Sequence, residues 1–225
     1  MEWDWEKGEN EFLKTLELNP NHVRARIFYA HLLTIMRQPD NALHQGKIAE
    51  SLDPLNPLTQ GLYAVVLAAA DECEAAKIHA EKGLAIESDH YFTHGALGGA
   101  LECLGDYATA FEMWKATNLD LWETYEVTSL LEKIFLEKGW IEVIKEAIKL
   151  NEELYAKDGR MGIVGQAERY VSVGKYDRAM DYYEQAYTLH LPDLPYLSQS
   201  NTYNLMKNNP RYIVLLKKMN LPVDP

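Results

Sequence analysis

The stretch ALGGALECLGDYATAFEMW, residues 96–114, contains two short apolar patterns separated by a break. Leu97 and Leu101 recur at helical spacing before the break. Gly105 follows, and a glycine at this place is typical of the end of a helix. Beyond it, small and aromatic residues as far as Trp114 recur at the spacing of a second helix. The stretch therefore predicts two helices that pair around a short turn.

The same order of residues recurs along the chain. A small or apolar residue returns in the second helix at intervals of 34, 34, 34, 34 and 35, at Gly8, Ala42, Ala76, Ala110, Ile144 and Ala179. The turn glycines agree independently, since Gly105, Gly139 and Gly174 are 34 and 35 residues apart. Where the turn glycine is missing, we expect the hairpin to rest on Asp71. A fixed period of this length indicates a helical repeat array.

Three segments carry the pattern most fully: YAHLL followed by PDNALHQGKIAESLDP in residues 29–54, the stretch at 96–114, and VGKYDRAMDYYEQAY at 173–187. They resemble the tetratricopeptide repeat family, whose 34-residue helix-turn-helix unit carries small, aromatic and proline residues in this order. The resemblance covers about residues 3–191, and the chain is similar to the C-terminal arrays of bacterial multidomain regulatory proteins. It implies an all-α, right-handed superhelical solenoid of antiparallel helix-turn-helix repeats with a C-terminal capping helix.

The repeat register predicts the domain boundaries. The array spans residues 1–191, with a half repeat at 1–20 and repeats at about 21–54, 55–88, 89–122, 123–158 and 159–191. The opening segment reads as the second helix of a repeat, and we expect its partner helix to precede Met1. The segment 192–225 falls outside the period, and Asn209 with Pro210 predicts a helix over about 209–219. Such a helix caps the apolar face of a last repeat.

Composition argues against several classes of function. The 225 residues carry 22 Lys and Arg against 34 Asp and Glu, a formal charge of −12, so we expect no nucleic-acid partner. No apolar stretch approaches about 20 residues, which predicts a soluble chain without membrane insertion. Cys73 and Cys103 are too few for a disulfide framework and favour a reducing, cytoplasmic compartment. A removed N-terminal signal or domain would leave no trace here. Cys103 fits a reactive thiol or a small inert hydrophobic residue.

Candidate chemical sites have structural explanations beside the functional ones. The glycines of GALGGALECLG, residues 95–105, lie in a helical register with no strand before them, so they do not predict a phosphate loop. His90 and His94 fit a metal site on one helix face, or an inter-repeat turn and a helix start. Glu152 and Glu153 read as a solvated helix face. We therefore expect a protein that is not an enzyme and holds no metal and no cofactor.

The resemblance also implies where a ligand binds, because the first helix of each repeat lines the concave side of the superhelix. The family's groove-facing pattern nominates Arg24, Ile27, His31, Thr34, Leu58, Gly61, Val65, Ala68, Phe92, Gly95, Gly99, Glu102, Cys103, Met161, Val164 and Glu168. The middle of this set is small and apolar, which leaves room for a partner's helix or extended segment, and the polar ends can orient it. Alternatively, the small residues only permit tight coiling, or the chain's own tail fills the groove.

These patterns favour a non-catalytic protein–protein interaction module that binds a peptide or helix of a partner in the concave groove. The alternative is a structural or oligomerisation module of a larger signalling or transcription-regulatory protein, which contacts a preceding domain or a second copy through its open N-terminal face. Clamping of a terminal carboxylate is not predicted, since Arg24 alone offers a cation near the groove entrance. The identity of the partner does not follow from the fold.

Overall fold

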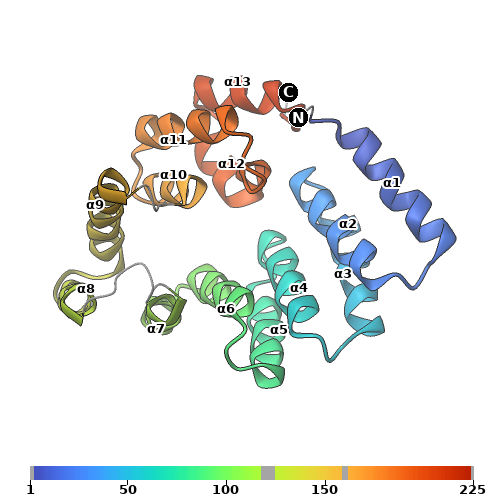
Figure 1. Ribbon diagram of the computed structural model, residues 1–225, viewed down its shortest axis with the longest axis horizontal. Coiled ribbons are helices and arrows are strands. Elements are labelled where there is room, and N and C mark those ends of the chain that lie inside the picture. The colour runs from blue at the N-terminus through green and yellow to red at the C-terminus, as the bar shows by residue number, and fades with distance from the viewer. Residues whose placement is uncertain (1–2, 118–124, 159–161, 224–225) are drawn as a thin grey trace. The chain divides into compact units, whose positions relative to one another are not determined.

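The computed structural model describes residues 3–117, 125–158 and 162–223. The chain divides into two compact units, Glu2–Asn118 and Leu119–Pro225, and each is described by itself. The described residues of both units form helices joined by short turns, as expected for an all-α repeat fold (Figure 1).

The described part of the N-terminal unit consists of one helix followed by three consecutive helix pairs. Its helices are α1 (Trp5–Leu18), α2 (Val23–Ile35), α3 (Pro39–Leu52), α4 (Pro57–Ala69), α5 (Cys73–Ile86), α6 (Tyr91–Leu104) and α7 (Tyr107–Thr117). Each of α2, α4 and α6 packs against the helix that follows it. In addition α2 contacts α4, and α4 contacts α6, so the first helices of successive pairs lie side by side (Figure 1).

Small residues allow the paired helices of this unit to approach one another. Ala42, Ala76 and Ala110, which mark the period, are all at most 1% exposed. They pack in one core with Leu33 and Leu101 from the first helices. The 34-residue spacing therefore returns a small side chain to the same buried place in each second helix, where a larger one would separate the pair.

The turn inside each helix pair contains one residue in the left-handed backbone region. The predicted turn glycines Gly105, Gly139 and Gly174 have φ angles of 75°, 83° and 73°, which confirms their role as helix stops. Earlier repeats place Arg37 (φ 54°) and Asp71 (φ 66°) at the corresponding positions. Asp71 thus makes the turn itself, in keeping with the tolerance of aspartate for this conformation.

The C-terminal unit continues the same pattern of helix pairs. It contains α8 (Tyr125–Lys138), α9 (Trp140–Asp158), α10 (Ile163–Ser172) and α11 (Tyr176–Thr188), followed by the short 3₁₀ helix η1 (Leu194–Ser198), α12 (Ser200–Met206) and α13 (Pro210–Lys218). Buried Val143, Ala147 and Ala179 again supply small or branched side chains at the helix contacts. Within this unit, α8 packs on α9 and α10 packs on α11.

The last helix, α13, docks on α11 through its apolar face and through one arginine. Asn209 caps the helix by accepting hydrogen bonds from the amides of Arg211 (3.0 Å) and Tyr212 (3.2 Å). Leu215 and Leu216 are at most 2% exposed. The Arg211 guanidinium donates to both carboxylate oxygens of Glu184, at 3.1 and 2.9 Å. This helix therefore covers part of the last helix pair.

The segment before α13 holds structure that the period did not indicate. The helix α12 contacts α10 and η1 contacts α11, with Leu194, Leu197 and Met206 fully buried. The hydroxyl of Tyr212 donates to the Leu197 carbonyl at 2.6 Å and so ties α13 to η1. Polar residues dominate this stretch, which concealed its helical signal.

The first helix, α1, is the least buried of the N-terminal unit. None of its residues, all of them described, is buried, and Leu13 and Leu18 are 48% and 80% exposed. It contacts α2, where Phe12 stacks on Tyr29 with ring centroids 5.7 Å apart. The Tyr29 hydroxyl also donates to Glu9 at 2.8 Å. These contacts attach α1 to α2.

Candidate protein-binding surface

The side-by-side packing of α4 and α6 depends on a glycine. A Cβ atom on Gly61 would lie 2.8 Å from Thr93 Oγ1 and 3.1 Å from Phe92 Cδ1, so no larger residue fits without displacing α6. The Thr93 hydroxyl crosses the same contact and donates to the Pro57 carbonyl at 3.0 Å. The two first helices are consequently fixed as one surface.

One face of α6 remains open to solvent. Phe92, Gly95, Gly99 and Glu102 follow one another at helical spacing, and all four are exposed. Phe92 retains 39% of its accessible surface. Apart from the backbone of α6, a Cβ atom on Gly95 or Gly99 would meet no heavy atom of the described residues within 4 Å. The neighbouring α4 adds three half-buried apolar residues that pack on the core, Leu58, Val65 and Ala68. We call these seven residues the α4/α6 surface.

Several residues nominated from the sequence lie elsewhere. Ile27, His31, Thr34, Gly61 and Val164 are buried. The reason is visible at α2, where the His31 ring hydrogen-bonds the Leu62 carbonyl of α4 at 3.0 Å and Thr34 donates to the Ala30 carbonyl at 2.9 Å. These side chains serve the packing of helices, so the surface that a partner can reach on α2 is narrower than predicted.

The other nominated residues are divided between the two units. Arg24 is exposed on α2, and Glu168 is exposed on α10 of the C-terminal unit, together with buried Val164. Met161 lies outside the described residues. The nominated residues of α4 and α6 thus lie on two helices that contact each other, and each unit has its own set.

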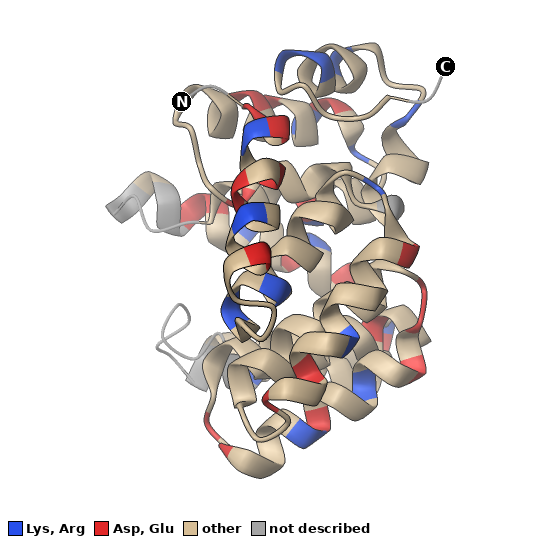
Figure 2. Ribbon diagram, turned by 90° about the vertical axis from the view of Figure 1, so that its right-hand side faces the viewer, with Lys and Arg blue, Asp and Glu red and all other residues tan. Residues whose placement is uncertain are grey.

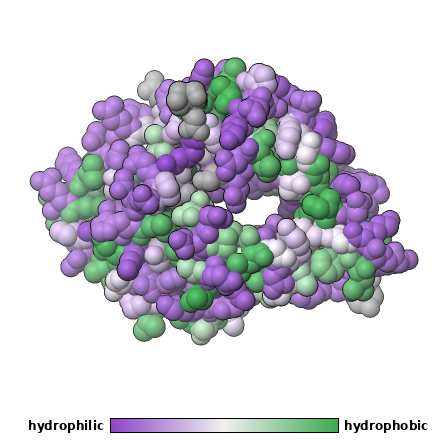
Figure 3. All heavy atoms as spheres, turned by 180° about the vertical axis from the view of Figure 1, so that it is seen from behind, coloured by the Kyte–Doolittle hydropathy of each residue, from purple (hydrophilic) through white to green (hydrophobic). Residues whose placement is uncertain are grey.

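Charge and hydropathy are mixed over the described helices. Figure 2 shows Lys and Arg interspersed with Asp and Glu along them. On the face drawn in Figure 3, apolar residues form small groups separated by polar ones. The α4/α6 surface is distinguished by its exposed glycines and by the exposed Phe92.

The two histidines considered as metal ligands bind backbone groups at the start of α6. His90 is the N-cap residue, and its Nδ1 atom lies 3.3 Å from the Thr93 amide, which donates to it, and 2.7 Å from the Thr93 hydroxyl. The Nε2 atom of His94 pairs instead with the Ser88 carbonyl at 2.7 Å. This geometry matches the interpretation as an inter-repeat turn and a helix start.

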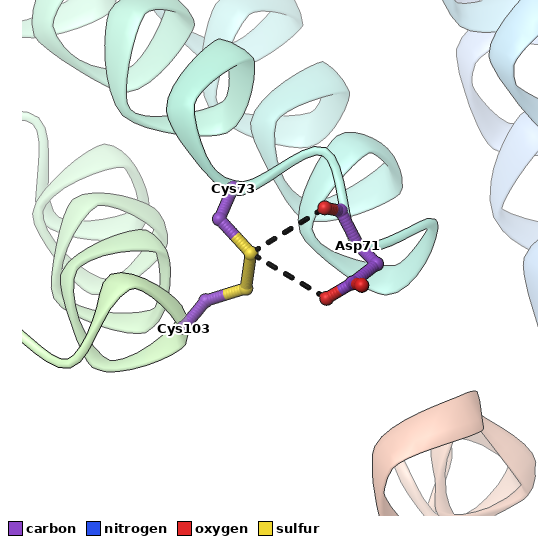
Figure 4. The surroundings of a disulfide bond; sticks show 3 residues. All are labelled: Asp71, Cys73 and Cys103. Atoms are coloured by element: carbon purple, nitrogen blue, oxygen red, sulfur yellow. Dashed lines mark hydrogen bonds between the residues drawn. A yellow bond between two sulfur atoms is a disulfide. The ribbon is translucent and has the colours of Figure 1, made fainter.

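The two cysteines correct an expectation from the sequence. Cys73, at the first position of α5, and Cys103, in the last turn of α6, form a disulfide with a Cα–Cα distance of 5.7 Å (Figure 4). Cys103 is therefore neither a reactive thiol nor an isolated hydrophobic residue in this structure. The cytoplasmic location inferred from cysteine usage stays a prediction, and the bond removes its main support.

A second correction concerns Glu152, which is a hydrogen-bonding centre of the C-terminal unit and not simply solvated. Its Oε1 atom accepts from Tyr170 (2.6 Å), Tyr182 (2.8 Å) and Arg178 (2.9 Å). Burial alone raises the pKa of Glu152, but these hydrogen bonds outweigh it and lower the pKa. The partners lie 18 to 30 residues away along the chain, a range that helix periodicity does not report.

Another strongly shifted group is also structural. Removal of the His31 imidazole from water lowers its pKa to about 4, although the hydrogen bond with Leu62 opposes this shift. The ring faces a backbone carbonyl inside the α2/α4 contact, so it has no open approach for a substrate. Among the described residues, moreover, no helix has both the length and the apolar character needed to cross a membrane.

Comparison with known proteins gives the fold and no closer relationship. No known protein family matches the sequence, and no curated protein matches it. Among solved structures, a tetratricopeptide repeat protein from Parabacteroides merdae has a TM-score of 0.50 at 19% identity over 96% of this chain and 86% of that one. Pseudomonas aeruginosa PilF has a TM-score of 0.48 at 17% identity, over 86% of this chain and 87% of that one. MamA has a TM-score of 0.45 at 16% identity, over 83% and 89%. The chain therefore has the helical-repeat fold of tetratricopeptide repeat proteins, as its sequence predicted.

Proposed function

We propose that this protein is a non-catalytic interaction module whose α4/α6 surface binds a helix or extended segment of a partner protein. The observation that carries the proposal is the open space above Gly95 and Gly99. Inside a helix, each glycine costs about 0.5–1 kcal/mol relative to alanine. Outside the backbone of α6 itself, no described residue lies close enough to require these two glycines. A partner that approaches the α6 backbone closely gives them a role.

The neighbouring side chains support an apolar contact with a fixed direction. Phe92 lies about one helical turn before Gly95 on α6, and half-buried Val65 lies on the neighbouring helix α4; both offer apolar area for burial. Glu102 is exposed toward the end of α6, and Arg24 is exposed at the start of α2. A bound segment with charges complementary to these two residues would be held in one orientation.

A matched pair of double variants tests the location of binding. Gly95→Leu with Gly99→Leu fills the open face, whereas Ala85→Leu with Ala108→Leu adds similar bulk at exposed positions of the second helices α5 and α7. Leucine is a better helix former than glycine, so the first variant keeps its helix. In pull-downs from the native lysate, proteins retained by the wild type and by the alanine-site variant should be lost only with the glycine-site variant. Equal retention by all three proteins would refute this location.

The second candidate function is self-association through α1, and the exposed apolar surface of that helix favours it. Leu13 and Leu18 are 48% and 80% exposed. A second copy that covers these residues would bury the apolar surface that α1 presents. Light scattering over a range of concentrations tests this candidate: a Leu13→Lys variant should shift the mass toward the monomer, and a concentration-independent monomer in the wild type excludes it.

A further inference from the structure

The disulfide joins two neighbouring repeats, and an acidic side chain lies beside it. Cys73 and Cys103 are the only cysteines in the sequence. They come from α5 and α6, helices of consecutive repeats, and both are half-buried and reachable from solvent. Asp71, in the turn before α5, is exposed beside them. Figure 4 shows that its side chain points toward the sulfur of Cys73.

The potential ligand atoms of the three side chains converge, and the disulfide itself holds the two sulfur atoms together. Asp71 Oδ1 lies 3.8 Å from Cys73 Sγ, and the Asp71 backbone oxygen lies 3.6 Å from the same atom. One carboxylate oxygen and the two sulfur atoms all lie within 4.8 Å of one another. Among the described residues, the trio of Asp71, Cys73 and Cys103 is the one group of three histidine, cysteine or acidic side chains whose potential ligand atoms lie this close together.

Asp71 occupies the left-handed turn position directly before the disulfide. The corresponding position is held by Gly105, Gly139 and Gly174 in three other repeats and by Arg37 in a fourth. A residue with a side chain pays about 1–2 kcal/mol in this conformation, although aspartate pays less than most. A disulfide sulfur carries no hydrogen to donate to the carboxylate, so the oxidised pair gains no hydrogen bond from it. A thiol can donate a hydrogen bond to the carboxylate, and a cation can bind to it, so the carboxylate gains a favourable interaction in either of these states.

We propose that the reduced protein binds a thiophilic divalent cation of the zinc type through the Asp71 carboxylate and the thiolates of Cys73 and Cys103. Two thiolates and one carboxylate are ligands that Zn²⁺ takes in tetrahedral sites, with a water molecule in the fourth position. The disulfide and the metal-bound pair are then alternative states of the same residues. Both states link α5 to α6, beside Glu102 on the α4/α6 surface.

The disulfide is converted into the metal-bound pair in two steps, reduction and then binding of the cation. A phosphine reduces the disulfide to two thiols and becomes the phosphine oxide, with water supplying the oxygen atom and the two hydrogen atoms. The cation then displaces one proton from each thiol, and both protons pass to solvent. Binding consequently tightens as the pH rises toward the ordinary pKa of a thiol, about 8.5.

Cobalt absorption tests the site in the full chain. The protein is reduced with tris(2-carboxyethyl)phosphine, freed of excess reductant without air, checked for two free thiols with Ellman's reagent, and titrated with CoCl₂. We expect one equivalent of Co²⁺ to give thiolate-to-cobalt charge-transfer absorption and the visible bands of a tetrahedral site, both removed by Zn²⁺. Cys73→Ser and Cys103→Ser should abolish the charge-transfer band. Asp71→Asn should weaken Co²⁺ binding about tenfold or more, whereas Asp40→Asn, an exposed aspartate in the preceding repeat, should leave it unchanged.

Three outcomes would overturn the proposal. The first is the absence of a charge-transfer band from protein with two free thiols. The second is a cobalt spectrum that persists in both serine variants and disappears in His94→Ala, which would place the ion at the start of α6. The third is a disulfide that resists reduction while the protein stays folded, because the thiol state that binds the cation would then not form.

Discussion

Replacement of Gly83 by alanine tests whether consecutive repeats are packed as closely as the structure places them. Gly83 is buried on α5. A Cβ atom there would lie 2.7 Å from Thr93 Cγ2, 3.2 Å from Gln60 Cβ and 3.2 Å from the Pro57 carbonyl oxygen. Thr93 cannot rotate away freely, because its hydroxyl donates to that same carbonyl. The added methyl group must therefore move α4 or α6.

The expected magnitude follows from two opposing effects. Overpacking of a closely packed contact costs about 1–3 kcal/mol. Alanine regains about 0.5–1 kcal/mol of helix propensity relative to glycine. Gly83→Ala should therefore lower the free energy of unfolding by about 1 kcal/mol. At Gly99 a Cβ would meet no described residue within 4 Å apart from the backbone of α6. Gly99→Ala should therefore gain helix propensity without any cost of overpacking and be more stable than the wild type. The two variants should differ by about 1–3 kcal/mol.

Thermal and urea unfolding, followed by circular dichroism, measure this difference. A chain of this size shifts its melting temperature by about 2–4 °C for each kcal/mol. Gly83→Ala should melt below the wild type and Gly99→Ala above it. If both variants are stabilised equally, the repeats are not in contact at Gly83, and the packing described for α4, α5 and α6 is wrong.

Two further predictions concern His31 and the last helix. The pKa of His31 is about 6.5 in the unfolded chain and is lowered to about 4 in the folded protein. The stability that neutral His31 contributes is therefore fully present above pH 6.5 and is lost as the pH falls from 6.5 to 4. The loss amounts to about 3 kcal/mol. In pH-dependent urea unfolding, His31→Gln should flatten this loss, whereas the exposed control His44→Gln should keep it. Arg211→Ala removes the hydrogen bonds that this partly exposed side chain donates to Glu184, Asp181 and the Asp177 carbonyl, so we expect a loss of about 1 kcal/mol after screening by solvent. Hydrogen exchange of α13 should accelerate in that variant and not in Lys217→Ala; equal exchange in both would contradict the docking role of Arg211.

The repeat fold could be predicted because residues of the same kind recur at a fixed interval along the sequence. Ala42, Ala76 and Ala110 return at 34 residues, and each is buried against the first helix of its pair. Gly105 and Gly174 mark the turns for the same reason, since the left-handed backbone favours glycine. The helices η1 and α12 have no such interval, and their burial depends on the particular surface of α10 and α11 that they cover.

The candidate surface was predictable only in part. Gly95 and Gly99 stand out in the sequence as glycines within a helical register, and the structure leaves both exposed. The same repeat register predicts His31 on the groove, but its ring is buried between α2 and α4, where it hydrogen-bonds the backbone of the next repeat. The Cys73–Cys103 bond was missed because its 30-residue separation differs from the period and depends on how α5 meets α6.

Site-specific photo-crosslinking tests the central claim most directly, namely that the α4/α6 surface binds a partner protein. A photoreactive p-benzoylphenylalanine is placed at position 99 on α6 or, as the control, at exposed position 85 on α5. After irradiation in the native cell extract, and identification of the products by mass spectrometry, position 99 should yield a discrete adduct with one partner polypeptide. Addition of unlabelled wild-type protein should compete that adduct away. The same adducts from position 85, or adducts from position 99 that the wild-type protein does not compete, would contradict the claim.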